Sequence, residues 1–320
     1  MVFLAGIDEA GYGPFVGPFV VGYSLFRVPH PKIDLWQHLE KVAAKKPLRK
    51  KEDRRLWVND SKKVHSGPRG RKRLERTVAA FRELLEASHT SADDWITADP
   101  CGDARWLDQA PWFREMDGPF CPGASPDRAR LDAASLHRRL QDAGCTLDGF
   151  GARAVPACEW NHLLSQTRNK GDALFLVTME VVRHLFKKTG DAPLRLELDR
   201  HGARAHYAEK LRVALNPEKV ITHGETSGGS TYTLQFPNRE VQLRFSEKAD
   251  LNHFSVALAS LAAKQTRERM MDGFNAWWQE QLPDVAPTKG YGVDGKRWLA
   301  DVLPQLESVG TDEKILRRSR

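Results

Sequence analysis

Residues 6–13, Gly-Ile-Asp-Glu-Ala-Gly-Tyr-Gly, constrain the fold of this chain more than any other stretch. The apolar residues 2–5 lead, as a strand would, into two adjacent carboxylates, Asp8 and Glu9. Neighbouring side chains of a strand point to opposite faces, so both acids cannot lie in a dry core. Burying an unpaired carboxylate costs roughly several kcal/mol. We therefore expect the pair at a strand end, beside a bound cation or open to solvent.

The residues that follow predict a structured loop and a second strand. Gly11 and Gly13 allow a close approach of backbone to a ligand or a positive φ. Prolines and a further glycine at 14–18 then precede the apolar run 19–26, which lacks polar alternation and so predicts a strand buried on both faces. An isolated Asp-Glu pair is more often an exposed turn, but these glycines and the later acids favour a ligand site.

Composition limits the class of protein. The chain has 320 residues, of which 41% are hydrophobic, enough for one large domain or two modest ones. No apolar run approaches the roughly 20 residues of a membrane span. Four cysteines without a Cys-x-x-Cys pair argue against structural zinc and predict a reduced, cytoplasmic protein. The net charge is +7, and seven basic residues lie in each of 45–55 and 62–76. Such runs suit a polyanion, although a solvated helix face explains them equally well.

The middle of the chain differs in character from the rest. Residues 59–63, Asn-Asp-Ser-Lys-Lys, predict a helix cap or polar loop, followed by a basic helix over about 69–87. Residues 90–156 are rich in proline and tryptophan, and only 127–143 has a helical pattern. A long irregular segment inside a compact domain is usually functional or inserted, so we expect an accessory elaboration outside the core sheet of a single domain, 1–320.

Regular structure is predicted again after residue 160. The patterns predict helices at 160–188 and 204–215, strands at 194–198 and from 220, a hairpin pairing 231–236 with 240–245, a long helix at 252–281 that opens a C-terminal helical portion, and a last helix near 295–307.

Four acids lie where these predicted elements begin or end: Asp8 and Glu9 at the first strand, Asp199 after residues 194–198, and Asp250 before the long helix. Alone, Asp250 could be a helix N-cap and Asp199 a turn residue. Together, converging carboxylates suit Mg²⁺ or Mn²⁺. Two such ions, about 4 Å apart, can activate water and stabilise the leaving oxygen of a phosphodiester.

The joint pattern resembles ribonuclease HII, the type 2 ribonuclease H family. The similarity lies in ordered blocks that cover perhaps two thirds of the chain: residues 6–11, the Gly-Pro pairs at 13–14 and 17–18, residues 59–63, Leu198-Asp199, residues 248–250 with 255–269, and Lys289-Gly290-Tyr291. Residues 90–156 match no part of the family pattern.

The resemblance implies an α/β protein with a ribonuclease H-like fold, a central mixed sheet flanked by helices. It implies a metal-dependent endonuclease that cuts the RNA strand of RNA/DNA hybrids, or ribonucleotides embedded in DNA, and leaves 3′-hydroxyl and 5′-phosphate ends. It assigns the metal-binding and catalytic roles to Asp8, Glu9, Asp199 and Asp250. It also implies substrate contacts from Gly11, Tyr12, Gly13, Lys62, Lys63, Lys264, Arg267 and Tyr291, with Tyr291 against a sugar and the four basic residues at backbone phosphates.

Three departures from the family pattern stand out. The family has Arg between the two motif glycines, where this chain has Tyr12, which cannot neutralise a phosphate but could stack or donate a hydroxyl hydrogen bond. Asp199 and Asp250 lie 51 residues apart (250 − 199), a longer separation than in compact bacterial members, and Gly292 replaces the usual proline after Tyr291. Tyr12 predicts weaker discrimination for a single embedded ribonucleotide.

Two other functions are compatible with the sequence. A nuclease of the same fold could act on another nucleic acid, such as long hybrids or branched DNA. A hybrid-binding protein that has lost catalysis is a further alternative, although a retired site has no reason to keep four mutually repelling carboxylates. The sequence does not determine the oligomeric state, for which a monomer is the default, and it predicts no membrane partner.

Overall fold

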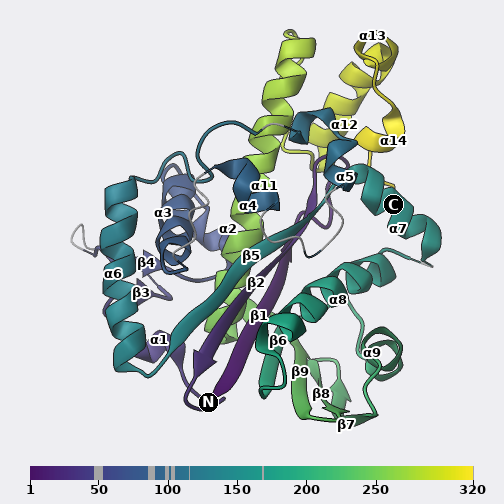
Figure 1. Ribbon diagram of the computed structural model, residues 1–320. Coiled ribbons are helices and arrows are strands. Elements are labelled where there is room, and N and C mark those ends of the chain that lie inside the picture. The colour runs from purple at the N-terminus through teal and green to yellow at the C-terminus, as the bar shows by residue number, and fades with distance from the viewer. Residues whose placement is uncertain are drawn as a thin grey trace.

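A mixed sheet of seven strands forms the centre of the computed structural model (Figure 1), which describes residues 1–46, 53–85, 91–97, 101, 105–114, 116–167 and 169–319. Its strand order is β5-β2-β1-β6-β9-β8-β7. The strands are β1 (Val2–Ala10), β2 (Phe19–Val28), β5 (Thr146–Val155), β6 (Leu194–Asp199), β7 (Lys219–Thr226), β8 (Gly229–Phe236) and β9 (Arg239–Ser246). The strand β6 runs parallel to β1 and to β9, and the other pairs are antiparallel.

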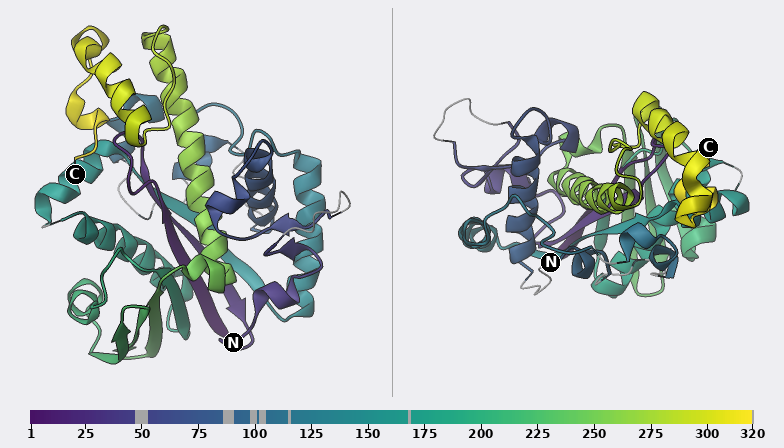
Figure 2. Two further views of the ribbon diagram at one scale, coloured as in Figure 1. Left: turned by 180° about the vertical axis from the view of Figure 1, so that it is seen from behind. Right: turned by 90° about the horizontal axis from the view of Figure 1, so that it is seen from above.

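Helices cover both faces of this sheet. The remaining elements are α1 (Leu35–His38), the strand pair β3 (Ala43–Ala44) and β4 (Leu56–Trp57), α2 (Ser61–Val64), α3 (Gly70–Glu83), α4 (Ala92–Thr97), α5 (Arg105–Asp108), η1 (Pro111–Phe113), α6 (Pro126–Asp142), α7 (Ala157–Gln166), α8 (Lys170–Thr189), α9 (Ala208–Leu215), α10 (Ala249–Asn252), α11 (Phe254–Gln281), α12 (Gly292–Val302), η2 (Leu303–Gln305), α13 (Leu306–Val309) and α14 (Glu313–Leu316). The long α11 crosses one face, and α8 lies on the other (Figure 2). The predicted α/β architecture, a mixed sheet flanked by helices, is confirmed.

The alternation of β1 divides the interior into two cores. Leu4 packs into the core beneath α11, α3 and α6, whereas Ala5 and Ile7 pack into the core beneath α8 and α9. Successive strand residues point to opposite faces, so one strand serves both layers. Nine of the ten residues of β2 are buried, which confirms the prediction of a strand covered on both faces.

Most of the strands and helices expected after residue 190 are present. The strand ending at Asp199 is confirmed as β6, the hairpin as β8 and β9, and the longest helix as α11. The helical stretch expected at 160–188 is divided into α7 and α8. The second helix begins anew because the Asn169 side chain accepts a hydrogen bond of 3.0 Å from Asp172 N, a standard N-cap.

Residues 146–155 correct the expectation that the segment 90–156 lies outside the core sheet. They form β5, which pairs with β2 and provides one edge of the main sheet. The strand contains Gly149 and Gly151, whose lack of side chains leaves room for Leu25 and Tyr23 of β2 and also hides the strand pattern in the sequence. The helix expected at 127–143 is confirmed as α6. The separability of residues 90–145 as an accessory part remains a prediction, and several of them, with 47–52 of the first basic run, lie outside the described residues.

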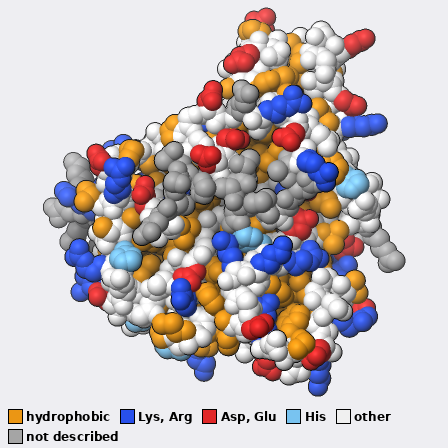
Figure 3. Space-filling view, viewed as in Figure 1, with side chains coloured by type: hydrophobic (Ala, Val, Ile, Leu, Met, Phe, Trp, Pro, Cys, Tyr) orange, Lys and Arg blue, Asp and Glu red, His pale blue; other side chains and the backbone are white. Residues whose placement is uncertain are grey.

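Two further features concern the expectations about membrane-spanning segments and about basic residues. Within the described ranges, no helix is both long and apolar enough to cross a bilayer. On the face seen in Figure 1, Lys and Arg side chains gather at the left edge and in a band across the middle (Figure 3). On this face, the basic residues are thus unevenly distributed.

The backbone of α11 lies against the sheet at two glycines. An added Cβ on Gly6 would come within 2.1 Å of Ser255 C, and one on Gly22 would come within 2.2 Å of Ala259 O. Both contacts are with backbone atoms, which cannot rotate away. Glycine at these positions therefore sets the distance between the helix and the two central strands.

We expect Gly6→Ala to lower the free energy of unfolding by about 1–3 kcal/mol or more, because the added methyl must displace α11. The matched control is Gly224→Ala on the exposed strand β7, where a Cβ meets nothing within 4 Å. Denaturant unfolding of both variants measures the effect. Equal stability of the two variants would show that the helix–sheet distance is adjustable.

Candidate metal and nucleic-acid site

Three of the predicted acids converge at the carboxyl ends of two parallel strands. Asp8 and Glu9 are near the end of β1, and Asp199 is the last residue of β6. Because Ile7 of β1 pairs with Leu198 of β6, the residues that follow each of them are neighbours. One ligand oxygen from each of Asp8, Glu9 and Asp199 lies within 4.8 Å of the others. The acids thus lie at strand ends, as expected from the cost of burying two adjacent carboxylates in a dry core.

The electrostatics of this cluster favour the neutral acids. Burial raises the pKa of Asp8 well above its usual range, and Glu9, Asp199 and Asp250 add to the shift. Burial and Asp199 raise the pKa of Glu9 to about 7, and burial also raises the pKa of Asp199. The hydrogen bonds from Glu9 N to Asp8 (2.8 Å) and from Ala249 N to Asp199 (3.1 Å) offset part of the cost. A hard divalent cation would offset the rest, and the all-oxygen donor set fits Mg²⁺ or Mn²⁺.

Asp250 lies on α10, near the cluster but outside the group of three. It is close enough to raise the pKa of Asp8, and its own pKa is raised to about 6 by burial and by Asp60 and Asp199. Its role as a fourth ligand remains a prediction. Asp60, which the sequence analysis did not assign to the site, caps α2 by accepting a 2.8 Å hydrogen bond from Lys62 N. Its place in the motif 59–63, beside the two lysines, was the available signal.

The two lysines of the short helix α2 lie beside the acids. Lys62 lowers the pKa of Glu9 and of Asp199, and Lys63 lowers the pKa of Asp250. Both side chains are on an exposed surface of α2. A phosphate bound to divalent cations at the carboxylates would lie next to the positive charges of these two lysines. Their predicted contact with phosphate fits this position.

The Gly11–Gly13 segment forms a loop at the end of β1. Gly11 has φ of +80°, and a Cβ there would lie 2.5 Å from Arg267 Nε, so only glycine fits. Gly13 has open space around it, because an added Cβ would meet nothing within 4 Å. The Tyr12 ring packs edge-on against Phe19 and Trp160, with centroid distances of 6.2 and 6.1 Å. These contacts hold the Tyr12 ring against the core beside the carboxylates.

Arg318 supports this loop and was not predicted from the sequence. It is 1% exposed. Its guanidinium donates to the carbonyls of Gly11 and Tyr12, at 3.0 Å for the second, and lies 4.8 Å from the Trp160 ring centroid. Burial, with Arg267 nearby, lowers its pKa to about 9. One Arg among several in a polar stretch carries no signal of such a long-range contact.

The last three predicted site residues lie farther along α11 and in the loop after it. Lys264 forms an ion pair of 2.6 Å with Glu268, one turn further along the same helix. Arg267 is 1% exposed, donates to Lys289 O at 3.0 Å and lies 4.7 Å from the Tyr291 ring centroid. Tyr291 is 41% exposed. Arg267 thus supports Gly11 and Tyr291 from beneath, while Tyr291 can reach a ligand.

The fold and the carboxylate cluster together define an α/β protein with a candidate centre for divalent cations. Solved structures similar to the chain are RNase HII and RNase HIII proteins. A chain of the PCNA:RNase HII complex from Archaeoglobus fulgidus is 15% identical with a TM-score of 0.42, and the similarity covers 100% of this chain and 95% of that one. Ribonuclease H2 from Pyrococcus horikoshii OT3 is 14% identical with a TM-score of 0.41, covering 98% and 92%.

Bst-RNase HIII in complex with Mn²⁺ is 12% identical with a TM-score of 0.40, and the similarity covers 99% of this chain and 66% of that one. No model of a protein family matches this chain, and no curated protein sequence matches it.

The raised pKa of Glu9 predicts a pH-dependent stability. Its pKa is 4.5 in the unfolded chain and about 7 in the folded protein, so folding favours the protonated form. In EDTA, the stability due to this group should be fully present below pH 4.5 and lost as the pH rises through about 7. Saturating Mg²⁺ or Mn²⁺ should recover stability above pH 7, since a ligand of the folded state stabilises it.

Denaturant unfolding of the wild type and of Glu9→Gln across this pH range, with and without cation, measures the effect. The variant should show a flatter pH dependence in EDTA and a smaller gain from the cation. Identical curves for the two proteins would contradict the assigned environment of Glu9.

Proposed function

We propose that this protein is a metal-dependent endonuclease of the ribonuclease HII type. Its substrate is the RNA strand of RNA/DNA hybrids or ribonucleotides embedded in duplex DNA, and its products carry 3′-hydroxyl and 5′-phosphate ends. The convergence of Asp8, Glu9 and Asp199 within 4.8 Å, with raised pKa values, carries the proposal. The order of the sequence motifs supports the family assignment.

Each group has a role in this proposal. Asp8 and Asp199 would share two ions, with Glu9 and Asp250 completing one site each. Bound divalent ions activate water and stabilise the leaving oxygen of a phosphodiester. Lys62 and Lys63, beside the acids, would hold the substrate backbone in register. The exposed ring of Tyr291 would pack against a sugar next to the cleaved bond.

The basic character of the chain supports a nucleic-acid partner. Its formal net charge is +7, and the lysines of α2 lie next to the acids. Attraction to phosphate supplies most of the sequence-independent affinity of a nucleic-acid-binding protein. Binding and catalysis should therefore depend on different residues.

We expect Asp199→Asn to abolish cleavage while leaving duplex affinity largely intact, because basic residues supply most of the binding. The control is Asp284→Asn, which makes the same change at an exposed residue after α11. Labelled duplexes with one ribonucleotide, four ribonucleotides or a full RNA strand, each with Mg²⁺ and with Mn²⁺, measure cleavage. Full activity of Asp199→Asn, or equal loss in the control, would refute the assignment.

Tyr12 is expected to weaken discrimination for a single ribonucleotide. A charge-assisted hydrogen bond from Arg to phosphate is worth roughly 1.5–3 kcal/mol, which a neutral phenol does not supply. Tyr12→Arg should therefore raise the rate on the single-ribonucleotide duplex relative to the full hybrid. Tyr12→Phe, which keeps the ring contacts with Phe19 and Trp160, controls for the hydroxyl.

The ratio of the two cleavage rates decides this prediction. An unchanged ratio in Tyr12→Arg would mean that the residue does not set specificity. A wild-type enzyme already strict for the single ribonucleotide would refute the premise.

A further inference from the structure

The segment 314–319 lies between the loop that follows β1 and the helix α7 (Figure 1). On the loop side, Arg318 N donates to Phe15 O at 2.8 Å, and Arg317 forms an antiparallel bridge with Val16. These backbone contacts fix the position from which the Arg318 side chain extends toward the loop.

On its other side, one residue of α7 holds the segment at three points. The Asn161 side-chain amide donates to the carbonyls of Lys314 and Arg317, at 2.8 Å each, and its oxygen accepts from Ser319 N at 2.7 Å. A side chain with both donors and an acceptor can make all of these bonds at once. The segment is therefore anchored on both sides, independently of the Arg318 side chain.

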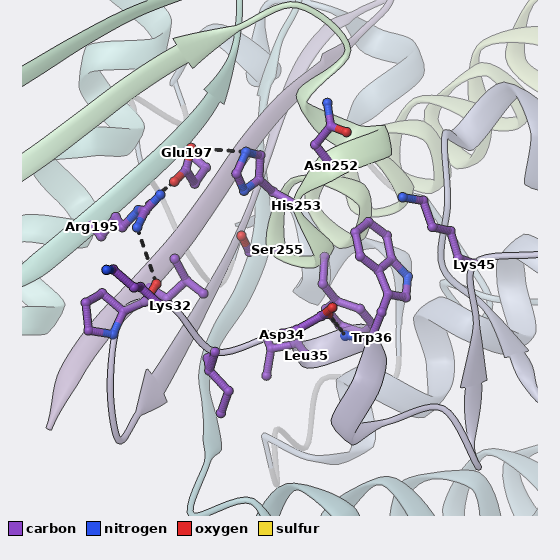
Figure 4. A pocket seen from close by; sticks show the side chains of 14 residues that line it. Lys32, Asp34, Leu35, Trp36, Lys45, Arg195, Glu197, Asn252, His253 and Ser255 are labelled. Atoms are coloured by element: carbon purple, nitrogen blue, oxygen red, sulfur yellow. Dashed lines mark hydrogen bonds and ion pairs between the residues drawn. The ribbon is translucent and has the colours of Figure 1, made fainter.

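The Arg318 guanidinium is buried without a carboxylate beside it. Figure 4 shows the more usual arrangement in a pocket of about 400 Å³ at the start of α11, where Arg195 Nε lies 2.6 Å from Glu197. Arg318 has no ion pair with a carboxylate in the described part of the chain, and Arg267 nearby carries the same charge. Burying a charge without a counter-charge costs free energy, so the fold gains little stability from this guanidinium.

The partners of the guanidinium are two successive carbonyls of the loop. It donates to Gly11 O and to Tyr12 O, at 3.0 Å for the second. A peptide group is planar and trans, so its N–H points away from its own carbonyl oxygen. The amides of Tyr12 and Gly13 therefore face away from Arg318.

These two amides are available to a ligand. Neither donates a hydrogen bond to another group within the residues that the structure describes. Gly13 is exposed, and an added Cβ there would meet nothing within 4 Å. Successive amides of a turn that face one side can donate to a single oxygen acceptor. Only Ala10 separates Gly11 from Glu9, so these donors lie beside the carboxylates.

We infer that Arg318 is a positioning residue for the substrate: its guanidinium holds the two carbonyls and so turns the amides of Tyr12 and Gly13 toward an oxygen of the bound strand. The inference rests on the proposed function for the identity of the strand and for its contact with this loop. Arg318 itself does not touch the strand. A planar guanidinium suits this role, because its fixed donors can hold two acceptors in one orientation.

The first test compares catalysis with binding. Arg318→Met keeps an unbranched chain beside Trp160 and removes both hydrogen bonds to the loop. It should lower the single-turnover cleavage rate with Mg²⁺ about 10- to 100-fold, the effect of a small misplacement of the substrate. Affinity for an RNA/DNA hybrid in EDTA should be largely unchanged, because basic residues supply most of it. The matched control, Arg317→Met, removes the same side chain from the neighbouring exposed position and should keep the wild-type rate.

A spectroscopic readout separates positioning from support of the fold. The chain has five tyrosines, so ¹⁵N-tyrosine labelling gives few amide signals, and Tyr12→Phe identifies the signal of Tyr12. In EDTA, adding the hybrid should shift this signal in the wild type and in Arg317→Met but not in Arg318→Met. A shift confined to RNA-containing duplexes would identify the acceptor as a ribose hydroxyl, and an equal shift with an all-DNA duplex would identify it as a phosphate. Both results support the positioning role.

A second variant tests the same role from the side of α7. Asn161→Ala removes the three hydrogen bonds that anchor the segment 314–319, without changing a residue that contacts the loop. It should lower the cleavage rate by a smaller factor than Arg318→Met does, with hybrid affinity again largely unchanged. Gln166→Ala, an exposed position on the same helix, is its control. This variant keeps the test decisive if Arg318→Met does not fold.

A wild-type rate in Arg318→Met or in Asn161→Ala, an equal loss in the controls, or a wild-type Tyr12 signal that responds to no duplex would each overturn the inference. Failure of the wild type to cleave would refute the proposed nuclease alone. The Tyr12 signal then decides the inference: a shift that is lost or reduced in the two variants supports it, and a shift that persists in them overturns it.

Discussion

Two glycines, Gly6 and Gly22, let the backbone of α11 lie directly on the central strands, and the candidate site depends on that contact. The start of α11 is held next to β1 and β6, so the preceding helix α10 must lie against the end of β6. Ala249 N donates to Asp199, and Asp250 follows at the edge of the carboxylate cluster. The packing of α11 on the sheet therefore also determines where the candidate carboxylate site lies.

Burial of charge is distributed unevenly around the site. The pKa values of the acids are raised because the acids are buried and lie close to one another. Arg267 and Arg318 are buried beneath the adjoining loop, and neither has an ion pair with a carboxylate in the described part of the chain. Burial of either guanidinium costs free energy, which aromatic faces and backbone carbonyls only partly offset. Negative and positive charge therefore lie on neighbouring elements without direct pairing. This separation leaves the carboxylates available to a cation and the loop attractive to an anion.

The sequence predicted the parts of the fold that rest on local patterns. The apolar runs of β1 and β2, the hairpin of β8 and β9 and the helix α11 follow from periodicity and turn residues, and the acids at strand ends follow from the cost of burying them. The edge strand β5 was missed because its glycines interrupt the apolar pattern and it follows an irregular segment. Arg318 could not be placed, since it acquires its role through contacts made only in the folded chain, whereas Asp60 had a signal in the motif 59–63 that was not used. Lys264 and Arg267 were predicted to contact phosphate, but on α11 their side chains contact Glu268 and the Lys289 carbonyl.

The loop between β1 and β2 is joined to two segments made much later in the chain. Phe15 N donates to Gly290 O at 2.8 Å, and Arg318 N donates to Phe15 O at 2.8 Å. Chains emerge from the ribosome from the N-terminus onward, so β1 and β2 are available long before residues 290 and 318. The loop that borders the carboxylates can take its final conformation only after those residues have been synthesised. The site is therefore completed late in synthesis. Until then, the nascent chain carries Asp8 and Glu9 without the two hydrogen bonds that hold the adjoining loop.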